Sequence, residues 1–211
     1  MFSRLLFLLF FLGLIPSSHA MVDLTPTVTA IVEDSVTYHE VGFQTPEGKV
    51  VFTLPPGWTI RGQKNRAQMT LPDDKSSAEA IVEVTSLAKP APLDETTIAA
   101  FKQQVIASLP PGSTKVTTVN EAQNSLMLSG NPSFEFVITY DLWGKVFQRS
   151  ALLVNGPQDR LAFRFTCLKA DFVALNTNFR RSLMTWRAVA AREIPKSVAA
   201  NEPSSSPKPA A

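Results

Sequence analysis

Residues 134–154, FEFVITYDLWGKVFQRSALLV, contain the pattern on which the fold depends. In the first half, apolar and polar side chains alternate from Phe134 to Leu142, which is the period of a β-strand with one buried face. Trp143-Gly144-Lys145 follows as a turn, and a second apolar run continues to Val154. The stretch therefore predicts an antiparallel hairpin.

Short apolar or alternating runs on both sides of this hairpin predict further strands, because each run is bounded by Gly, Pro, Asn or Asp. The predicted strands are residues 42–45, 49–54, 67–71, 78–87, 115–119 and 160–168. We expect the 115–119 strand to continue past a bulge to residues 125–128. Residues 28–32 and 36–38 also have strand character, but they lie in an acidic segment.

Two helices are predicted from apolar residues at intervals of three and four. We expect Asp94 to cap the first helix and Asp171 the second, because an N-cap carboxylate accepts a hydrogen bond from the first turn. Strands that run consecutively between two well-separated helices predict an α+β fold, with helices flanking a central antiparallel β-sheet. The apolar faces consist of Ile98, Phe101, Val105 and Leu109, and of Phe172, Leu175, Phe179, Leu183 and Trp186.

Four segments resemble the PsbP-like superfamily: residues 51–58 (VFTLPPGW), the helix at 94–109, Gly130-Asn131-Pro132, and residues 179–186 (FRRSLMTW). The resemblance covers residues 41–186 and implies an α/β/α sandwich. Members of this superfamily generally act as binding or assembly factors, so the resemblance also implies a noncatalytic role. Because the four segments build the core, no functional residue is carried over from the family.

Residues 1–20 have the parts of a secretory signal peptide: Arg4, an apolar run at 5–15, and small residues before a cut at Met21. The alternative is a membrane anchor, but a span needs about 20 apolar residues. We expect residues 21–40 to form an acidic leader, residues 41–187 the domain, and residues 188–211 a disordered tail rich in Pro, Ser and Ala. The mature chain is thus expected to be periplasmic or extracellular and not to span a membrane.

Composition excludes several kinds of chemistry. The chain has 20 Lys and Arg against 18 Asp and Glu, and one Arg lies in the signal peptide, so the mature net charge of +1 gives no support for nucleic-acid binding. Cys167 is the only cysteine, and its strand position predicts a buried thiol rather than a bond to a partner. His39 is the only histidine after the signal peptide. We therefore expect no metal site, no cofactor and no catalytic set.

Two groups of residues are candidate binding sites. Arg149, Arg160 and Arg164 are expected on one sheet face, where they could bind an anion or an acidic partner, or else pair with Glu135 and Asp141. Trp58 and Trp143 could line a pocket. We therefore expect a noncatalytic interaction or assembly factor of the cell envelope, with another envelope protein as its partner. The alternatives are a small-ligand or lipid-binding module and, less favoured, a hydrolase.

Overall fold

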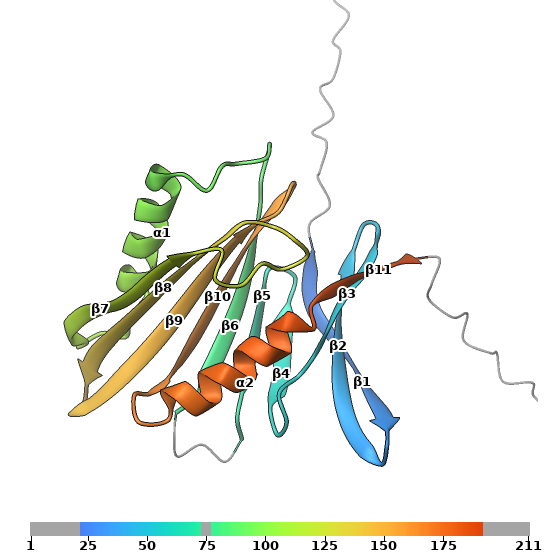
Figure 1. The fold of residues 1–211 in the computed structure, drawn as a ribbon, viewed down its shortest axis with the longest axis horizontal. Coiled ribbons are helices and arrows are strands. Elements are labelled where there is room, and N and C mark those ends of the chain that lie inside the picture. The colour runs from blue at the N-terminus through green and yellow to red at the C-terminus, as the bar shows by residue number, and fades with distance from the viewer. Residues whose placement is uncertain (1–21, 73–76, 192–211) are drawn as a thin grey trace, which may run out of the picture.

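The computed structural model describes residues 22–72 and 77–191, and the predicted signal peptide and residues 192–211 of the predicted tail lie outside them. Two antiparallel sheets make up most of the described chain, with strand orders β1-β2-β3-β11 and β4-β5-β6-β10-β9-β8-β7 (Figure 1). The elements are β1 (Asp23–Glu33), β2 (Val36–Thr45), β3 (Gly48–Thr53), β4 (Thr59–Gln63), β5 (Arg66–Thr70), β6 (Glu79–Ser86), α1 (Glu95–Ala107), β7 (Thr114–Gln123), β8 (Ser133–Leu142), β9 (Lys145–Asn155), β10 (Asp159–Leu168), α2 (Phe172–Met184) and β11 (Arg187–Ala190).

The predicted α+β fold, a central antiparallel sheet flanked by helices in an α/β/α sandwich, is wrong. The structure is mainly β, and its two helices have only 13 residues each. Residues 21–40 were expected to form a leader, whereas most of them form β1 and the first half of β2. Because β1, β2, β3 and β11 form a sheet of their own, this second sheet covers much of the core where helices were expected.

The predicted hairpin is confirmed. Strands β8 and β9 pair from Leu142 and Lys145 next to the turn to Ser133 and Val154 at the far end. Strand β10 then pairs with β9 and β6, which places it at the centre of the seven-stranded sheet. The expected continuation of β7 into residues 125–128 is wrong, because β7 ends at Gln123 and the chain turns there.

The two helices lie on opposite faces of this sheet. Phe101 and Val105 of α1 pack in a cluster with Phe134 and Phe136, whereas α2 packs on the face that carries Phe163. The N-cap of α1 is as predicted, since the Asp94 carboxylate accepts a hydrogen bond of 2.8 Å from the Thr97 N–H. Asp171 occupies the predicted N-cap position of α2, but the expected bond is missing, because its side chain makes no capping hydrogen bond.

The largest cluster of buried side chains lies between the two sheets and α2, and it includes Trp186. Trp186 follows α2 and precedes β11, and only 8% of its surface is exposed. Its ring stacks on Phe52 of β3 with centroids 5.4 Å apart, and it meets Phe163 of β10 edge-on at 5.5 Å. A third ring, Phe43 of β2, lies 6.0 Å away. One side chain therefore joins the aromatic cores of both sheets.

The chain after Trp186 closes the smaller sheet. Residues 188–190, which were assigned to the tail, belong to β11 and pair with β3. The pairing needs a glycine at position 48, because a Cβ there would lie 2.2 Å from the carbonyl oxygen of Val189. Just before β11 begins, the hydroxyl of Thr185 accepts a 2.7 Å hydrogen bond from the Thr53 N–H, and the hydroxyl of Ser182 donates to the Thr53 carbonyl. Helix α2 and β11 thus share the edge of β3.

Trp186→Ala is expected to lower the free energy of unfolding by about 3–5 kcal/mol, because it removes the ring that both sheets contact. Urea denaturation measures this loss. The matched control is Trp143→Ala, since Trp143 is 86% exposed. That control should change stability by no more than about 0.5 kcal/mol. Equal losses in the two variants would show that Trp186 does not join the sheets.

Candidate functional site

The structure brings the three predicted arginines onto one sheet face. Arg149 lies opposite Thr166 in the β9–β10 ladder, and Arg160 and Arg164 precede Thr166 on alternate positions of β10. This face also carries α1, through Phe136 and its neighbours. The predicted placement of the patch is therefore correct, but each guanidinium group already has partners within the protein.

Arg149 is the most buried of the three, with 8% of its surface exposed. Its Nε donates to Thr166 Oγ1 at 2.9 Å, and its Nη1 donates to Ser108 Oγ at 3.0 Å. Ser108 is the C-cap of α1, where a cation interacts favourably with the helix dipole. Burial lowers the pKa of the Arg149 guanidinium and raises the pKa of the neighbouring Tyr140 hydroxyl. Arg149 therefore holds the end of α1 on the sheet.

The other two arginines bind neighbouring strands. Arg164 forms an ion pair with Glu83 at 2.8 Å, and Glu83 also pairs with Arg66 at 2.7 Å. Arg160 donates to Asn155 Oδ1 at 2.8 Å. The alternative pairing with Glu135 and Asp141 is wrong, because these carboxylates bind Arg180 and Lys115 instead. What remains of the anion-binding hypothesis rests on the partly exposed Arg160.

The two tryptophans that were expected near a pocket occupy different environments. Trp58 follows the Pro55-Pro56-Gly57 turn, is 7% exposed, and packs on Phe165 with ring centroids 6.1 Å apart. Trp143 lies in the β8–β9 turn with 86% of its surface exposed. Trp58 is thus part of the core, and Trp143 is presented to solvent.

His39 and Cys167 also lie in different environments. His39 is exposed on β2, whereas Cys167 has no exposed surface, as predicted for a core thiol. Among residues 22–72 and 77–191, no three His, Cys, Asp or Glu side chains are grouped closely enough to hold a metal ion. A search of the same residues finds no helix with the length and apolar character needed to cross a membrane.

The outer part of the β1–β2 hairpin, residues 27–40, was not predicted as a site, and we call it the hairpin arm. Its root is fixed by the buried side chains of Val41 and Phe43, but the arm itself extends beyond the core (Figure 1). Five of the thirteen large hydrophobic side chains exposed in the described chain lie on it, with Val32 at 70%. The five are Val28, Ile31, Val32, Val36 and Tyr38.

The arm presents backbone as well as side chains. Strand β1 is the edge of its sheet, and a bulge next to Pro26 separates the arm from the start of the strand, where the Leu24 N–H is bonded to the Lys64 carbonyl. Asp34 and Ser35 both have positive φ angles, as in a two-residue type I′ turn. In an antiparallel ladder, hydrogen-bonded and non-hydrogen-bonded residue pairs alternate, and the pair Glu33 and Val36 next to this turn is hydrogen-bonded. The N–H and C=O groups of Val28, Ala30 and Val32 therefore face outward, away from β2.

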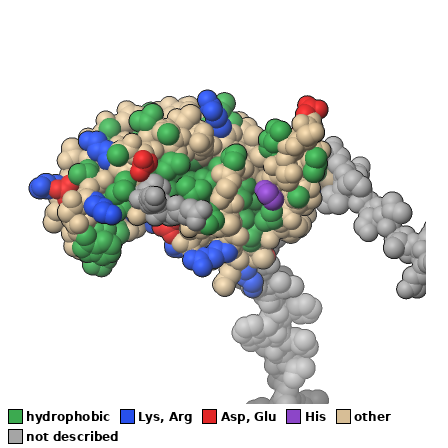
Figure 2. All heavy atoms as spheres, turned by 90° about the horizontal axis from the view of Figure 1, so that it is seen from below, with side chains coloured by type: hydrophobic (Ala, Val, Ile, Leu, Met, Phe, Trp, Pro, Cys, Tyr) green, Lys and Arg blue, Asp and Glu red, His purple; other side chains and the backbone are tan. Residues whose placement is uncertain are grey.

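A hollow of about 310 Å³ lies beside the arm. Tyr38 forms one wall, Pro55 and Pro56 contribute apolar surface, and Asn178 and Arg181 of α2 add polar groups. Viewed from below, hydrophobic side chains reach the surface over the hairpin arm at the right of the molecule and over the β8–β9 turn at the left (Figure 2). The sequence contained a signal for the arm in the alternation of residues 27–32, but the acidic residues around it led to the assignment as a leader.

No protein-family model matches the sequence, and a search of curated proteins finds no similar chain. Among solved structures, the protein is similar to PA94, a Pseudomonas aeruginosa protein of unknown function (TM-score 0.47, 11% identity, 77% of this chain and 97% of that one). It is also similar to LpqN, involved in cell envelope biogenesis of Mycobacterium tuberculosis (TM-score 0.49, 12% identity, 76% and 90%). A Bacteroides thetaiotaomicron structure has a TM-score of 0.42 at 9% identity, over 68% of this chain and 46% of that one. The PsbP-like resemblance stays a prediction at these levels of similarity.

Arg149→Ala is expected to lower the free energy of unfolding by about 2 kcal/mol or more, because it leaves buried hydroxyl partners and a cavity under α1. Thermal or urea denaturation measures the loss. Arg61→Ala is the control, since Arg61 is exposed on β4 and bonds only to Gln68 among the described residues. A loss of stability no larger than that of the control would show that Arg149 does not hold α1 on the sheet and would leave it as a candidate binding residue.

Proposed function

We propose that this protein is a noncatalytic interaction factor of the cell envelope, and that it binds an extended segment of a partner protein along the free edge of β1. The observation that carries the proposal is the hairpin arm, with its exposed apolar side chains and outward-facing backbone groups. An edge strand of this kind is a template for strand addition, in which main-chain hydrogen bonds supply affinity and alternate side chains supply specificity.

The arm lacks the usual protections of an edge strand. Natural edges are commonly blocked by Lys, by Pro or by a covering loop. In β1, Pro26 lies at the bulge before the arm, and residues 22–48 contain no Lys or Arg. Val28 and Val32 are 47% and 70% exposed on alternate positions of the same strand. Exposed valines at this spacing suit a partner strand with apolar side chains on alternate positions.

The charge of the arm narrows the chemistry of the partner. Glu33 and Asp34 lie at the turn, and neither forms an ion pair with another described residue, whereas Glu40 at the root pairs with Arg187 at 2.6 Å. Like charges across a strand pair are unfavourable, and opposite charges are favourable. The segment that fits is therefore extended, apolar on alternate positions, and basic where it meets the turn.

The experiment introduces a photo-crosslinking amino acid at position 32 of the full chain in its native cells. We expect a discrete adduct with one partner protein, and mass spectrometry should map the crosslink to a basic, extended segment. Ala30→Pro should abolish the adduct, because it removes an outward N–H that a partner strand would need and leaves the β1–β2 ladder intact.

Position 173 on α2 serves as the matched control, since Val173 is 78% exposed and lies outside the arm. An equal adduct at position 173, or an adduct at position 32 that survives Ala30→Pro, would rule out strand addition. Circular dichroism on the Ala30→Pro variant verifies that the loss of the adduct does not come from unfolding.

The hollow beside Tyr38 supports ligand binding as a second candidate function. Its apolar walls and the guanidinium of Arg181 suit a small molecule with an apolar body and a carboxylate. Calorimetry with decanoate should then show binding that weakens about tenfold in Arg181→Gln, in line with the loss of one charge-assisted hydrogen bond. Arg61→Gln is the control. Absence of heat with the parent protein, or equal affinities in the two variants, would remove this candidate.

A further inference from the structure

The β8–β9 turn presents an aromatic side chain on a rigid support. Trp143 and Gly144 both have positive φ angles, 49° and 74°, which forms a tight turn between long strands. Directly below the turn, the rings of Tyr140 and Phe147 stack with centroids 5.6 Å apart and pack with the buried Leu142. Trp143 is therefore exposed to solvent on a tight turn whose neighbouring strand residues are packed together.

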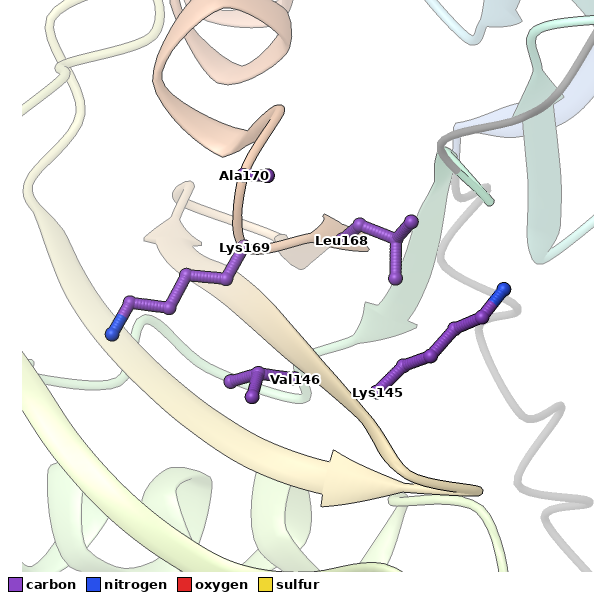
Figure 3. Close-up of a pocket in the computed structure, with 5 residues that line it drawn as sticks. All are labelled: Lys145, Val146, Leu168, Lys169 and Ala170. Atoms are coloured by element: carbon purple, nitrogen blue, oxygen red, sulfur yellow. The ribbon is translucent and has the colours of Figure 1, made fainter.

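Next to this turn lies an open hollow of about 650 Å³ (Figure 3). Val146, Leu168 and Ala170 provide its apolar surface, while the side chains of Lys145 and Lys169 extend on two sides of it. The Lys169 N–H donates to the Val146 carbonyl at 2.9 Å, which fixes the β10–α2 loop against β9. The two lysines thus stand on backbone that is tied together.

Among residues 22–72 and 77–191, two lysines at this end of the molecule have no acidic partner. Asp141, the acid of β8 next to the turn, forms a 2.8 Å ion pair with Lys115. Lys145 and Lys169 form no ion pair with any described residue within 4.0 Å, and Asp171 at the start of α2 is the other described acid nearby in the sequence. The surface around Trp143 therefore combines an exposed indole, a small apolar floor and two available ammonium groups.

We propose that the β8–β9 turn docks this protein on the surface of an anionic phospholipid bilayer. Trp143 would lie at the level of the headgroups, where the amphipathic indole is favoured. Lys145 and Lys169 would meet lipid phosphates, and Val146 with the apolar floor would face the acyl boundary. This function goes beyond partner binding by the arm and rests on a separate surface.

The size of the surface favours a bilayer over a protein partner. A stable protein–protein interface buries about 800 Å² on each side, over some 20–30 residues. One turn and a five-residue hollow do not supply that area, but a projecting tip can enter a lipid interface without a complementary surface. Two lysines and one tryptophan give weak, reversible attachment that salt should reverse.

The tryptophans of this protein make the test direct. The chain has three, and Trp58 and Trp186 are 7% and 8% exposed, so a change in emission on binding reports on Trp143. The experiment uses the chain from Met21 onward, which contains every described element of the fold. We expect a blue shift and co-sedimentation with vesicles of phosphatidylcholine and phosphatidylglycerol in equal amounts. Neither should occur with phosphatidylcholine alone or at about 0.5 M salt, where charges are screened within a few ångströms.

Trp143→Ala should abolish the blue shift and most of the co-sedimentation. The double variant Lys145→Glu/Lys169→Glu should weaken partitioning at least about 25-fold, since each basic residue near an anionic surface contributes about fivefold. Lys89→Glu is the control, because Lys89 is exposed in the loop before α1. Docking by the turn would be overturned by equal partitioning of Trp143→Ala and the parent, by binding to neutral vesicles, by absence of binding, or by an equal loss in Lys89→Glu.

Discussion

The contact of Trp186 with both sheets is the constraint on which the rest of the structure depends. Aromatic pairs at 5–6 Å contribute beyond the area that they bury, and Trp186 makes such pairs with Phe52 of one sheet and Phe163 of the other. The residue also separates α2 from β11, so its position determines where β11 begins. Since β3 is the one described strand that pairs with β11, the indole fixes the smaller sheet, and with it the hairpin arm, relative to the larger sheet.

Anchoring of the arm at its root explains how an apolar edge strand can remain exposed. Val41 and Phe43 are fully buried, whereas the pairs beyond them gain little from packing and are held by the backbone ladder. A Cβ at Gly62 would lie 2.3 Å from the Leu24 carbonyl oxygen, so a glycine lets the start of β1 cross close over β4. The arm is therefore oriented by its base, and its outer half contributes more to recognition than to stability.

The sequence predicted those parts of the fold whose physical signal is local. Apolar side chains alternate in residues 134–142 and recur at helical intervals in residues 98–109 because one face of each element is buried. The structure has both elements, as β8 and α1. Residues 42–45 and 49–54 of the smaller sheet were predicted as strands, but residues 21–40 were taken as a leader because β1 and the outer half of β2 are exposed on both faces, so alternation there marks no buried face. Most of strand β11 was assigned to the tail for the same reason, since its four residues include no buried side chain. The arginines were placed on the correct face, but their partners were not predictable, since Ser108 reaches Arg149 across 41 residues of sequence.

The two exposed hairpin ends differ in the groups that they offer, and this difference separates the binding modes that we propose. At the β8–β9 turn, both strands have a neighbouring strand on each side, β7 next to β8 and β10 next to β9. Their backbone N–H and C=O groups are therefore already hydrogen-bonded within the sheet, and a partner can contact their side chains. Lipid headgroups need no strand geometry, and an indole with two ammonium groups suffices for them. At the arm, β1 pairs with a single neighbour among the described strands, and its edge groups can be satisfied by another strand as well as by water. Because acidic residues lie at the arm and basic residues at the turn, an anionic bilayer would attract the turn and repel the arm, which would leave the edge of β1 available to a protein partner.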